Sequence, residues 1–224
     1  MVLNGYKKIK KMFYNEYYQH LHIHNPKTGG KSLMFSVSKN QKGWKRDYPM
    51  HIKLNNIENA HIELFNKVKD YTKTVTVRNP WDHAVSYYYH ALCKERFFKE
   101  NFFSIKGFKN MNENQKTNLD LSFSSFINNG YHNYIQNHFL KNSKNLKFDI
   151  VFKYEEYDKI LSFFEEKYKT LIDKNFNHHS RSRIQTVNNI QIVDDYRKLY
   201  NTETIDKVAI YSQEIIKKYN YTFE

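Results

Sequence analysis

His24-Asn25-Pro26-Lys27-Thr28-Gly29-Gly30-Lys31-Ser32 separates two segments with different hydrophobic patterns. The preceding residues, Tyr18–Ile23, favour a strand, and the following residues, Leu33–Val37, have the apolar spacing of a helix. A strand, a glycine-containing turn and a helix in this order place backbone N–H groups at the positive end of the helix dipole, where an anion is stabilised. The turn adds four polar side chains: Lys27, Thr28, Lys31 and Ser32. The sequence therefore predicts an anion-binding site here.

Strand-like and helix-like segments alternate along the rest of the chain. The strand-like segments are Gln19–His24, Thr72–Arg78 and Phe148–Lys153. The helix-like segments are Lys31–Lys39, Asn59–Val68, Pro80–Lys94, Phe123–Asn128, Tyr157–Tyr168, Asp194–Tyr200 and Thr202–Tyr219. This alternation predicts an α/β fold with a central parallel sheet flanked by helices, in which ligands bind at the carboxyl ends of the strands. We expect residues 1–18 to form a basic N-terminal extension and residues 19–224 to form one domain.

The composition limits the functional classes. The chain has 224 residues and a formal net charge of +13, which favours an anionic partner, although a solvated lysine-rich surface accounts equally well for most of the lysines. The sequence has no zinc-finger spacing and no RNA-recognition signature, so no nucleic-acid partner is expected. One cysteine, Cys93, excludes an internal disulfide and is typical of a reducing compartment. Because no signal peptide or transmembrane run is present, a cytoplasmic location is expected.

A second informative segment spans Val77–Tyr88. Arg78 ends a buried strand, Asn79 is suited to cap the following helix, and Pro80 is suited to its first position. Ser86 follows Arg78 by about two helical turns, so the two side chains could hold one phosphate together. The structural alternative is an arginine paired with an acidic residue and a serine that faces solvent.

The two segments together resemble the nucleotide motifs of sulfotransferases, and most closely those of the carbohydrate branch with heparan sulfate 2-O-sulfotransferase-like and bacterial members. The resemblance implies a P-loop-like three-layer fold. It also implies that the cofactor is 3′-phosphoadenosine 5′-phosphosulfate (PAPS), with adenosine 3′,5′-bisphosphate as product. Weaker likenesses follow at residues 148–157, 177–183 and 200–223. The residues that would bind the cofactor are Pro26, Lys27, Thr28, Gly29, Gly30, Lys31, Ser32, Arg78, Ser86, Arg181 and Arg183.

The resemblance also implies a reaction. Lys27 would stabilise charge on the transferring sulfuryl group, and His51 falls where this branch places its general base, although from the residues alone His51 is as readily a surface histidine. The acceptor would be a hydroxyl group, expected on an oligosaccharide or polysaccharide, and no metal is required. Two positions depart from the family pattern: Lys31 replaces a usual threonine, and His83 stands where arginine is common.

Rival interpretations remain at this stage. Gly30-Lys31-Ser32 ends like a Walker A loop, which would suit a P-loop kinase, but Asn25 stands where that loop needs its first glycine. The neighbouring strand also ends in Arg78 rather than in an acid for Mg²⁺. A non-catalytic domain that binds acidic glycan or nucleic acid would explain the charge. His22 and His24 alternate on one strand face, but because no acid or cysteine completes a metal set, a core role is favoured.

Overall fold

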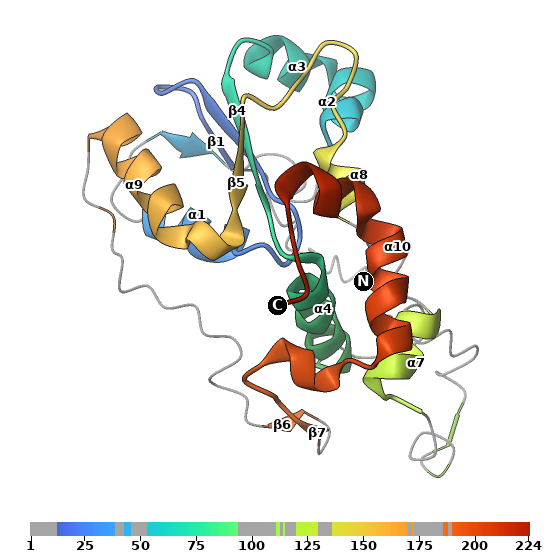
Figure 1. The fold of residues 1–224 in the computed structure, drawn as a ribbon. Coiled ribbons are helices and arrows are strands. Elements are labelled where there is room, and N and C mark those ends of the chain that lie inside the picture. The colour runs from blue at the N-terminus through green and yellow to red at the C-terminus, as the bar shows by residue number, and fades with distance from the viewer. Residues whose placement is uncertain are drawn as a thin grey trace, which may run out of the picture. The chain divides into compact units, whose positions relative to one another are not determined.

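A computed structural model describes residues 13–38, 43–45, 53–93, 111–112, 114, 120–129, 136–169, 172, 186–187 and 190–224. The chain divides into two compact units, each built from two segments. Unit 1 comprises Met1–Val77 and His138–Asn177, and it contains a five-stranded sheet. Unit 2 comprises Arg78–Asn137 and His178–Glu224, and its described part is mainly helical (Figure 1).

The sheet of unit 1 has the strand order β3-β1-β2-β4-β5. The strands are β1 (Phe13–Asn15), β2 (His20–Ile23), β3 (Trp44–Lys45), β4 (Thr72–Val77) and β5 (Ile150–Lys153). β2, β4 and β5 are parallel, which confirms the three strands expected from the sequence. β1 and β3 add antiparallel pairs, so the sheet is mixed rather than wholly parallel. β1 lies within residues 1–18 and joins the sheet because Phe13 and Tyr14 are buried.

Helices cover both faces of this sheet. On one face, α2 (Leu54–Ala60) and α3 (Ile62–Val68) pack against apolar side chains of β2 and β4. On the other face, α1 (Gly30–Ser38) and α9 (Tyr157–Tyr168) pack against Phe13 and Phe152. A short 3₁₀ helix, η3 (Tyr154–Glu156), connects β5 to α9. Unit 1 is therefore an α/β arrangement with helices on either side of the sheet, as the alternating pattern predicted.

The predicted helix Asn59–Val68 corresponds to α3 and the last two residues of α2, and the earlier part of α2, residues 54–58, was not predicted. His61 has φ −136° and ψ 63°, which is not helical, and it ends α2 and precedes α3. The interruption lets Leu54 and Ile57 of α2 pack in the same core cluster as Leu64 and Val68 of α3. The sequence has neither glycine nor proline at this break, which is why the pattern alone predicted one continuous helix.

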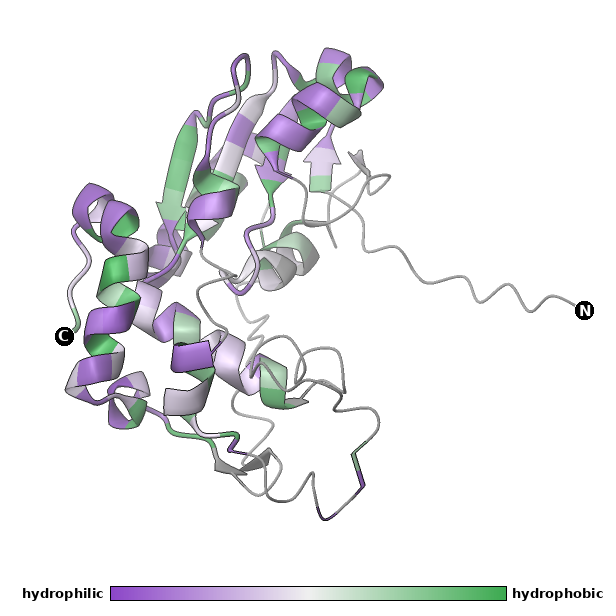
Figure 2. Cartoon of the chain, turned by 90° about the vertical axis from the view of Figure 1, so that its right-hand side faces the viewer, coloured by the Kyte–Doolittle hydropathy of each residue, from purple (hydrophilic) through white to green (hydrophobic). Residues whose placement is uncertain are grey.

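Unit 2 is built around α4 (Pro80–Cys93), α7 (Phe123–Asn129) and α10 (Thr202–Tyr219). Unit 2 also contains the 3₁₀ helix η4 (Tyr196–Leu199) and a hairpin of β6 (Thr186–Val187) and β7 (Ile190–Gln191). The short helix α8 (Asn137–Leu140) begins at the last residue of the first segment of unit 2, and its other three residues belong to unit 1. α4, α7 and α10 confirm the helices expected at 80–94, 123–128 and 202–219 as far as the described residues reach, and Lys94 lies outside them. Asp194–Tyr200 forms only η4. Green and purple positions alternate along α10, as expected for a helix that buries one face (Figure 2). Within the described residues, no helix has the length and apolarity needed to cross a bilayer.

Candidate anion-binding site

The predicted turn lies between β2 and α1, at the edge of the sheet where β2, β4 and β5 have their carboxyl ends. Lys27 has φ +65° and Gly29 has φ +77°, so the backbone is left-handed at two positions before α1 begins at Gly30. The first N–H groups of a helix have no partner within the helix, and α1 carries no acidic residue in its first turn. The local geometry and charge therefore suit an anion.

Asn25 and Thr28 fix the shape of this turn. The Asn25 amide Nδ2 donates to the Thr76 carbonyl of β4 at 3.0 Å. The Thr28 hydroxyl donates to the Asn25 carbonyl at 2.8 Å. Both side chains are buried, and glycine at position 25, as in a Walker A loop, could not make the bond to β4. Thr28 therefore acts here through the backbone of the turn, and Asn25 ties the turn to the neighbouring strand.

Aromatic rings lie against both glycines of the turn. A Cβ atom on Gly30 would lie 2.2 Å from Cδ2 of His24, and one on Gly29 would lie 2.8 Å from Cε2 of Tyr154. His24 directly follows β2, and Tyr154 begins η3, directly after β5. Sequence reasoning gave neither side chain a role at the turn, although Tyr154 follows a strand that ends at the same edge. The rings leave no room for a side chain at either glycine.

Lys27 is half-buried and keeps a left-handed backbone without being glycine. This conformation costs a non-glycine residue about 1–2 kcal/mol. Pro26, which precedes it, is also half-buried, as is Ser32 in the first turn of α1. A strained lysine beside a helix N-terminus is the kind of feature that persists where the side chain has a function.

In unit 2, Arg78 is held at both its backbone and its side chain. Its N–H donates to Oε1 of Gln136 at 2.9 Å, and its carbonyl accepts from Nε2 of Gln136 at 2.6 Å. Nε of Arg78 lies 2.6 Å from Oδ2 of Asp82, one helical turn further on. The ion pair between Arg78 and an acidic residue, which the sequence offered as the structural alternative, is therefore present, and it involves Nε. The guanidinium group carries four further N–H bonds on Nη1 and Nη2, through which arginine holds phosphate oxygens.

The start of α4 follows the capping chemistry predicted from the sequence. Oδ1 of Asn79 accepts from the Trp81 N–H at 3.0 Å, and Pro80 is the first residue of the helix. Ser86 lies further along α4 and is partly exposed. His83, where the family commonly has arginine, is buried and packs edge-on against Tyr87. His83 is therefore a core residue of unit 2.

His20 and His22 of β2 lie in the core beneath α9. Nε2 of His20 and Nδ1 of His22 lie 2.8 and 2.9 Å from the Thr74 hydroxyl, and the Tyr168 hydroxyl bonds to Nδ1 of His20. Burial lowers the pKa of His22 from 6.5 to about 4. The pKa of His20 is lowered by burial, then by His22 and Lys167. This confirms a core role for His22, and the described residues contain no cluster of three metal-ligating side chains.

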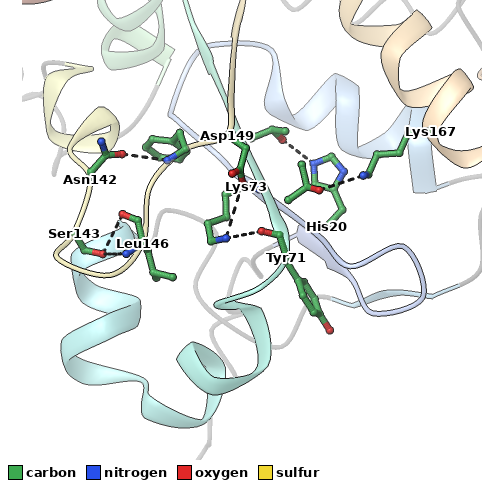
Figure 3. Close-up of polar contacts among 11 residues, drawn as sticks. His20, Tyr71, Lys73, Asn142, Ser143, Leu146, Asp149 and Lys167 are labelled. Carbon is green, nitrogen blue, oxygen red and sulfur yellow. Dashed lines mark hydrogen bonds and ion pairs between the residues drawn. The ribbon is translucent and has the colours of Figure 1, made fainter.

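Polar residues near the opposite, amino-terminal end of β4 mainly contact one another (Figure 3). The Lys73 ammonium bonds to the Tyr71 carbonyl and lies 3.9 Å from the Asp149 carboxylate. Asp149 also accepts from the Lys73 N–H at 2.7 Å, and Lys167 donates to the Thr72 hydroxyl at 3.3 Å. These contacts join β4 to β5 and α9, so this end of the strand has a structural role.

Several predicted site residues lie outside what the structure describes. They are His51, Arg181 and Arg183, and of Lys31 only the backbone is described. Among the described site residues, Pro26, Lys27, Thr28, Gly29, Gly30 and Ser32 lie together in unit 1, and Arg78 and Ser86 lie in unit 2. A scan against protein-family models and searches of curated proteins and solved structures found no match to this chain.

Proposed function

We propose that this chain is a PAPS-dependent sulfotransferase with a P-loop-like nucleotide site. It would transfer the sulfuryl group of PAPS to a hydroxyl group of an acceptor, and we propose a carbohydrate as that acceptor. The observation that carries the proposal is the turn before α1, where Lys27 and Gly29 are left-handed and the helix begins without an acidic residue. Such a turn is suited to the phosphosulfate end of the cofactor.

The charged and polar groups of the site have proposed roles. The Lys27 ammonium and the N–H groups of residues 28–31 would bind the phosphosulfate and stabilise charge on the departing phosphate oxygen. Arg78 and Ser86 would bind the 3′-phosphate and so set the register of the cofactor, with Arg181 or Arg183 closing over the nucleotide. His51 would take the proton from the acceptor hydroxyl. The acceptor oxygen then forms a bond to sulfur as the bond from sulfur to the phosphate oxygen breaks in line, which leaves adenosine 3′,5′-bisphosphate.

A nucleoside triphosphate suits the described residues less well. The Asn25 amide bonds to β4 where a Walker A loop has glycine, and β4 leads into Arg78, which is already paired with Asp82. The rival in which the chain only binds acidic glycans relies on the net charge of +13 and leaves the strained Lys27 unexplained. The same charge suits an acidic polysaccharide as the acceptor.

Calorimetry with three ligands tests the proposal. We expect adenosine 3′,5′-bisphosphate to bind more tightly than either ATP with Mg²⁺ or heparin. Lys27→Ala and Arg78→Ala should weaken that binding, whereas Lys159→Ala, which removes a lysine that is 76% exposed, should not. Tight Mg²⁺-dependent binding of ATP would favour the kinase instead, and binding of heparin alone would favour a glycan-binding domain.

Turnover is tested with labelled PAPS and a panel of polysaccharides, with a mass-shifted product as the readout. His51→Ala should abolish product formation while adenosine 3′,5′-bisphosphate still binds. Near-normal product formation by His51→Ala would show that another group is the base. Absence of any sulfated product with all acceptors, together with weak bisphosphate binding, would refute the proposed activity.

A further inference from the structure

The segment that follows α10 returns to the first turn of α4. Asn220 has φ +52° and ends α10, and the Tyr221 N–H donates to the Ile216 carbonyl at 3.2 Å. The next residues, Thr222, Phe223 and Glu224, each make a contact near the start of α4 or with η4. All of these residues belong to unit 2. We call Tyr221–Glu224 the return segment.

Phe223 lies among three aromatic rings. Its ring centroid lies 5.6 Å from Trp81, 5.1 Å from Tyr200 and 5.9 Å from Tyr196, each in an edge-on arrangement. The Tyr196 hydroxyl donates to the Glu224 carbonyl at 3.1 Å. Edge-on ring pairs at these separations are favourable beyond the burial of their area. The return segment is therefore anchored on both sides of Phe223.

The return segment also bonds to the residue that caps α4. Nδ2 of Asn79 donates to the Thr222 carbonyl at 2.9 Å, while Oδ1 of the same amide caps the Trp81 N–H. The amide group is planar, so fixing its nitrogen fixes the direction of its oxygen. Trp81 is held as well, since its indole N–H donates to the Ile205 carbonyl at 3.1 Å and its carbonyl accepts from the Tyr200 hydroxyl at 2.9 Å.

Asp82, the next residue, carries this arrangement to Arg78. Its N–H lies 3.5 Å from Oδ1 of Asn79, and its carboxylate forms the 2.6 Å ion pair with Nε of Arg78. The direction of the guanidinium group thus depends on the first turn of α4. The backbone of Arg78 is fixed separately, by Gln136.

We infer that the return segment is a positioning element for Arg78 and thereby determines selectivity for a ligand with a 3′-phosphate. This inference rests on the proposed function, because it assigns the 3′-phosphate to Arg78. Thr222 contacts Asn79, and Phe223 contacts Trp81. Asn79 and Trp81 fix the first turn of α4 and so the position of Asp82, whose carboxylate orients the guanidinium group of Arg78. Since Gln136 holds the Arg78 backbone, losing Phe223 loosens the side chain more than the main chain.

The test compares adenosine 3′,5′-bisphosphate with adenosine 5′-monophosphate, because the ratio of their dissociation constants isolates the 3′-phosphate. Wild-type protein should prefer the bisphosphate. Phe223→Ala should reduce this preference about threefold to tenfold, the size of one net hydrogen bond, with monophosphate affinity unchanged. Phe223→Tyr, which keeps the ring, should retain the preference. Tyr211→Ala truncates an exposed tyrosine of α10 and is the matched control.

Asn79→Ser provides an independent arm, because serine keeps a capping oxygen but lacks the Nδ2 donor to Thr222. It should lower the preference as Phe223→Ala does, and it carries the test if Phe223→Ala does not fold. Folding is checked by far-ultraviolet circular dichroism, because Trp81 contacts both Phe223 and Asn79 and its fluorescence would report the substitutions themselves. A folded Phe223→Ala or Asn79→Ser variant with the wild-type preference would overturn the inference and leave the proposed function standing. No preference in the wild-type protein would instead refute the proposed function.

Discussion

Acidification should destabilise unit 1 through His22. Burial lowers the pKa of His22 to about 4, whereas in the unfolded chain it is near 6.5. Above pH 6.5 His22 is neutral in both the folded and the unfolded state, so its protonation does not reduce the stability of the folded state. As the pH falls below 6.5, only the unfolded state takes up a proton, so stability is lost until the pH approaches 4. The linkage relation gives a loss of about 2 kcal/mol by pH 5 and about 3 kcal/mol in total.

His22→Phe is the variant that isolates this effect. The ring of His22 lies edge-on to Phe13 and Phe164, so a phenyl ring suits its surroundings. The Thr74 hydroxyl loses one partner but keeps the 2.8 Å contact with His20. We expect the variant to be within about 1 kcal/mol of wild type at pH 7.5, because one net hydrogen bond is lost.

Urea unfolding at pH 7.5, 6 and 5 measures the difference. A Trp81→Phe background leaves Trp44 as the reporter, and Trp44 packs on Phe13 and Tyr168 of unit 1. The wild type should lose about 2 kcal/mol more than His22→Phe between pH 7.5 and pH 5. Burial, the larger cause, lowers the pKa of His20 in both proteins, and His22→Phe removes only the smaller contribution that His22 makes to that lowering. Equal losses would show that His22 is not a buried neutral group and would refute the reasoning.

Three further predictions concern the turn and Arg78. Lys27→Gly should be about 1 kcal/mol more stable than Lys27→Ala, which corresponds to about 2–4 °C in Tm, because only glycine relieves the left-handed strain. Equal stability of the two variants would show that the backbone at position 27 is not left-handed. Gly30→Ala should destabilise unit 1 by about 1–3 kcal/mol, because the added methyl group would collide with the His24 ring. Urea unfolding measures the change, and unchanged stability would contradict the close contact between His24 and Gly30. Gln136→Leu should lower the free energy of unfolding of unit 2 by about 3 kcal/mol, because the Arg78 N–H and carbonyl lose their hydrogen bonds to Gln136. Unfolding is followed by Trp81 fluorescence, and wild-type stability would contradict the prediction.

Capping and turn residues in the sequence predicted where two of the helices begin. Asn79 and Pro80 identify the start of α4, and the glycines after Lys27 identify the turn before α1. β1 could not be predicted, because a three-residue strand carries almost no periodic signal and its pairing with β2 depends on the buried Phe13 and Tyr14. Asp194–Tyr200 has helical spacing, but only Tyr196–Leu199 closes a 3₁₀ turn.

The supporting residues of the site were harder to predict than the site itself. Arg78 stands out at the end of a β-branched run, and its spacing to Asp82 is the ordinary one for an ion pair on a helix. Gln136 lies 58 residues from Arg78 in the sequence, and nothing in its neighbours indicates that it bonds to a strand end. The sequence placed Tyr154 after a strand and before a helix, but its contact with Gly29 could not be predicted. That contact depends on how β5 lies beside β4.

The contact between His24 and Gly30 has an evolutionary consequence. A side chain at position 30 collides with the imidazole at position 24, whereas a smaller residue at position 24 would first open the space. A replacement at position 30 should therefore cost less stability after position 24 has become smaller than before. Among descendants of this sequence, we expect the two positions to vary together and an imidazole at 24 to be accompanied by glycine at 30.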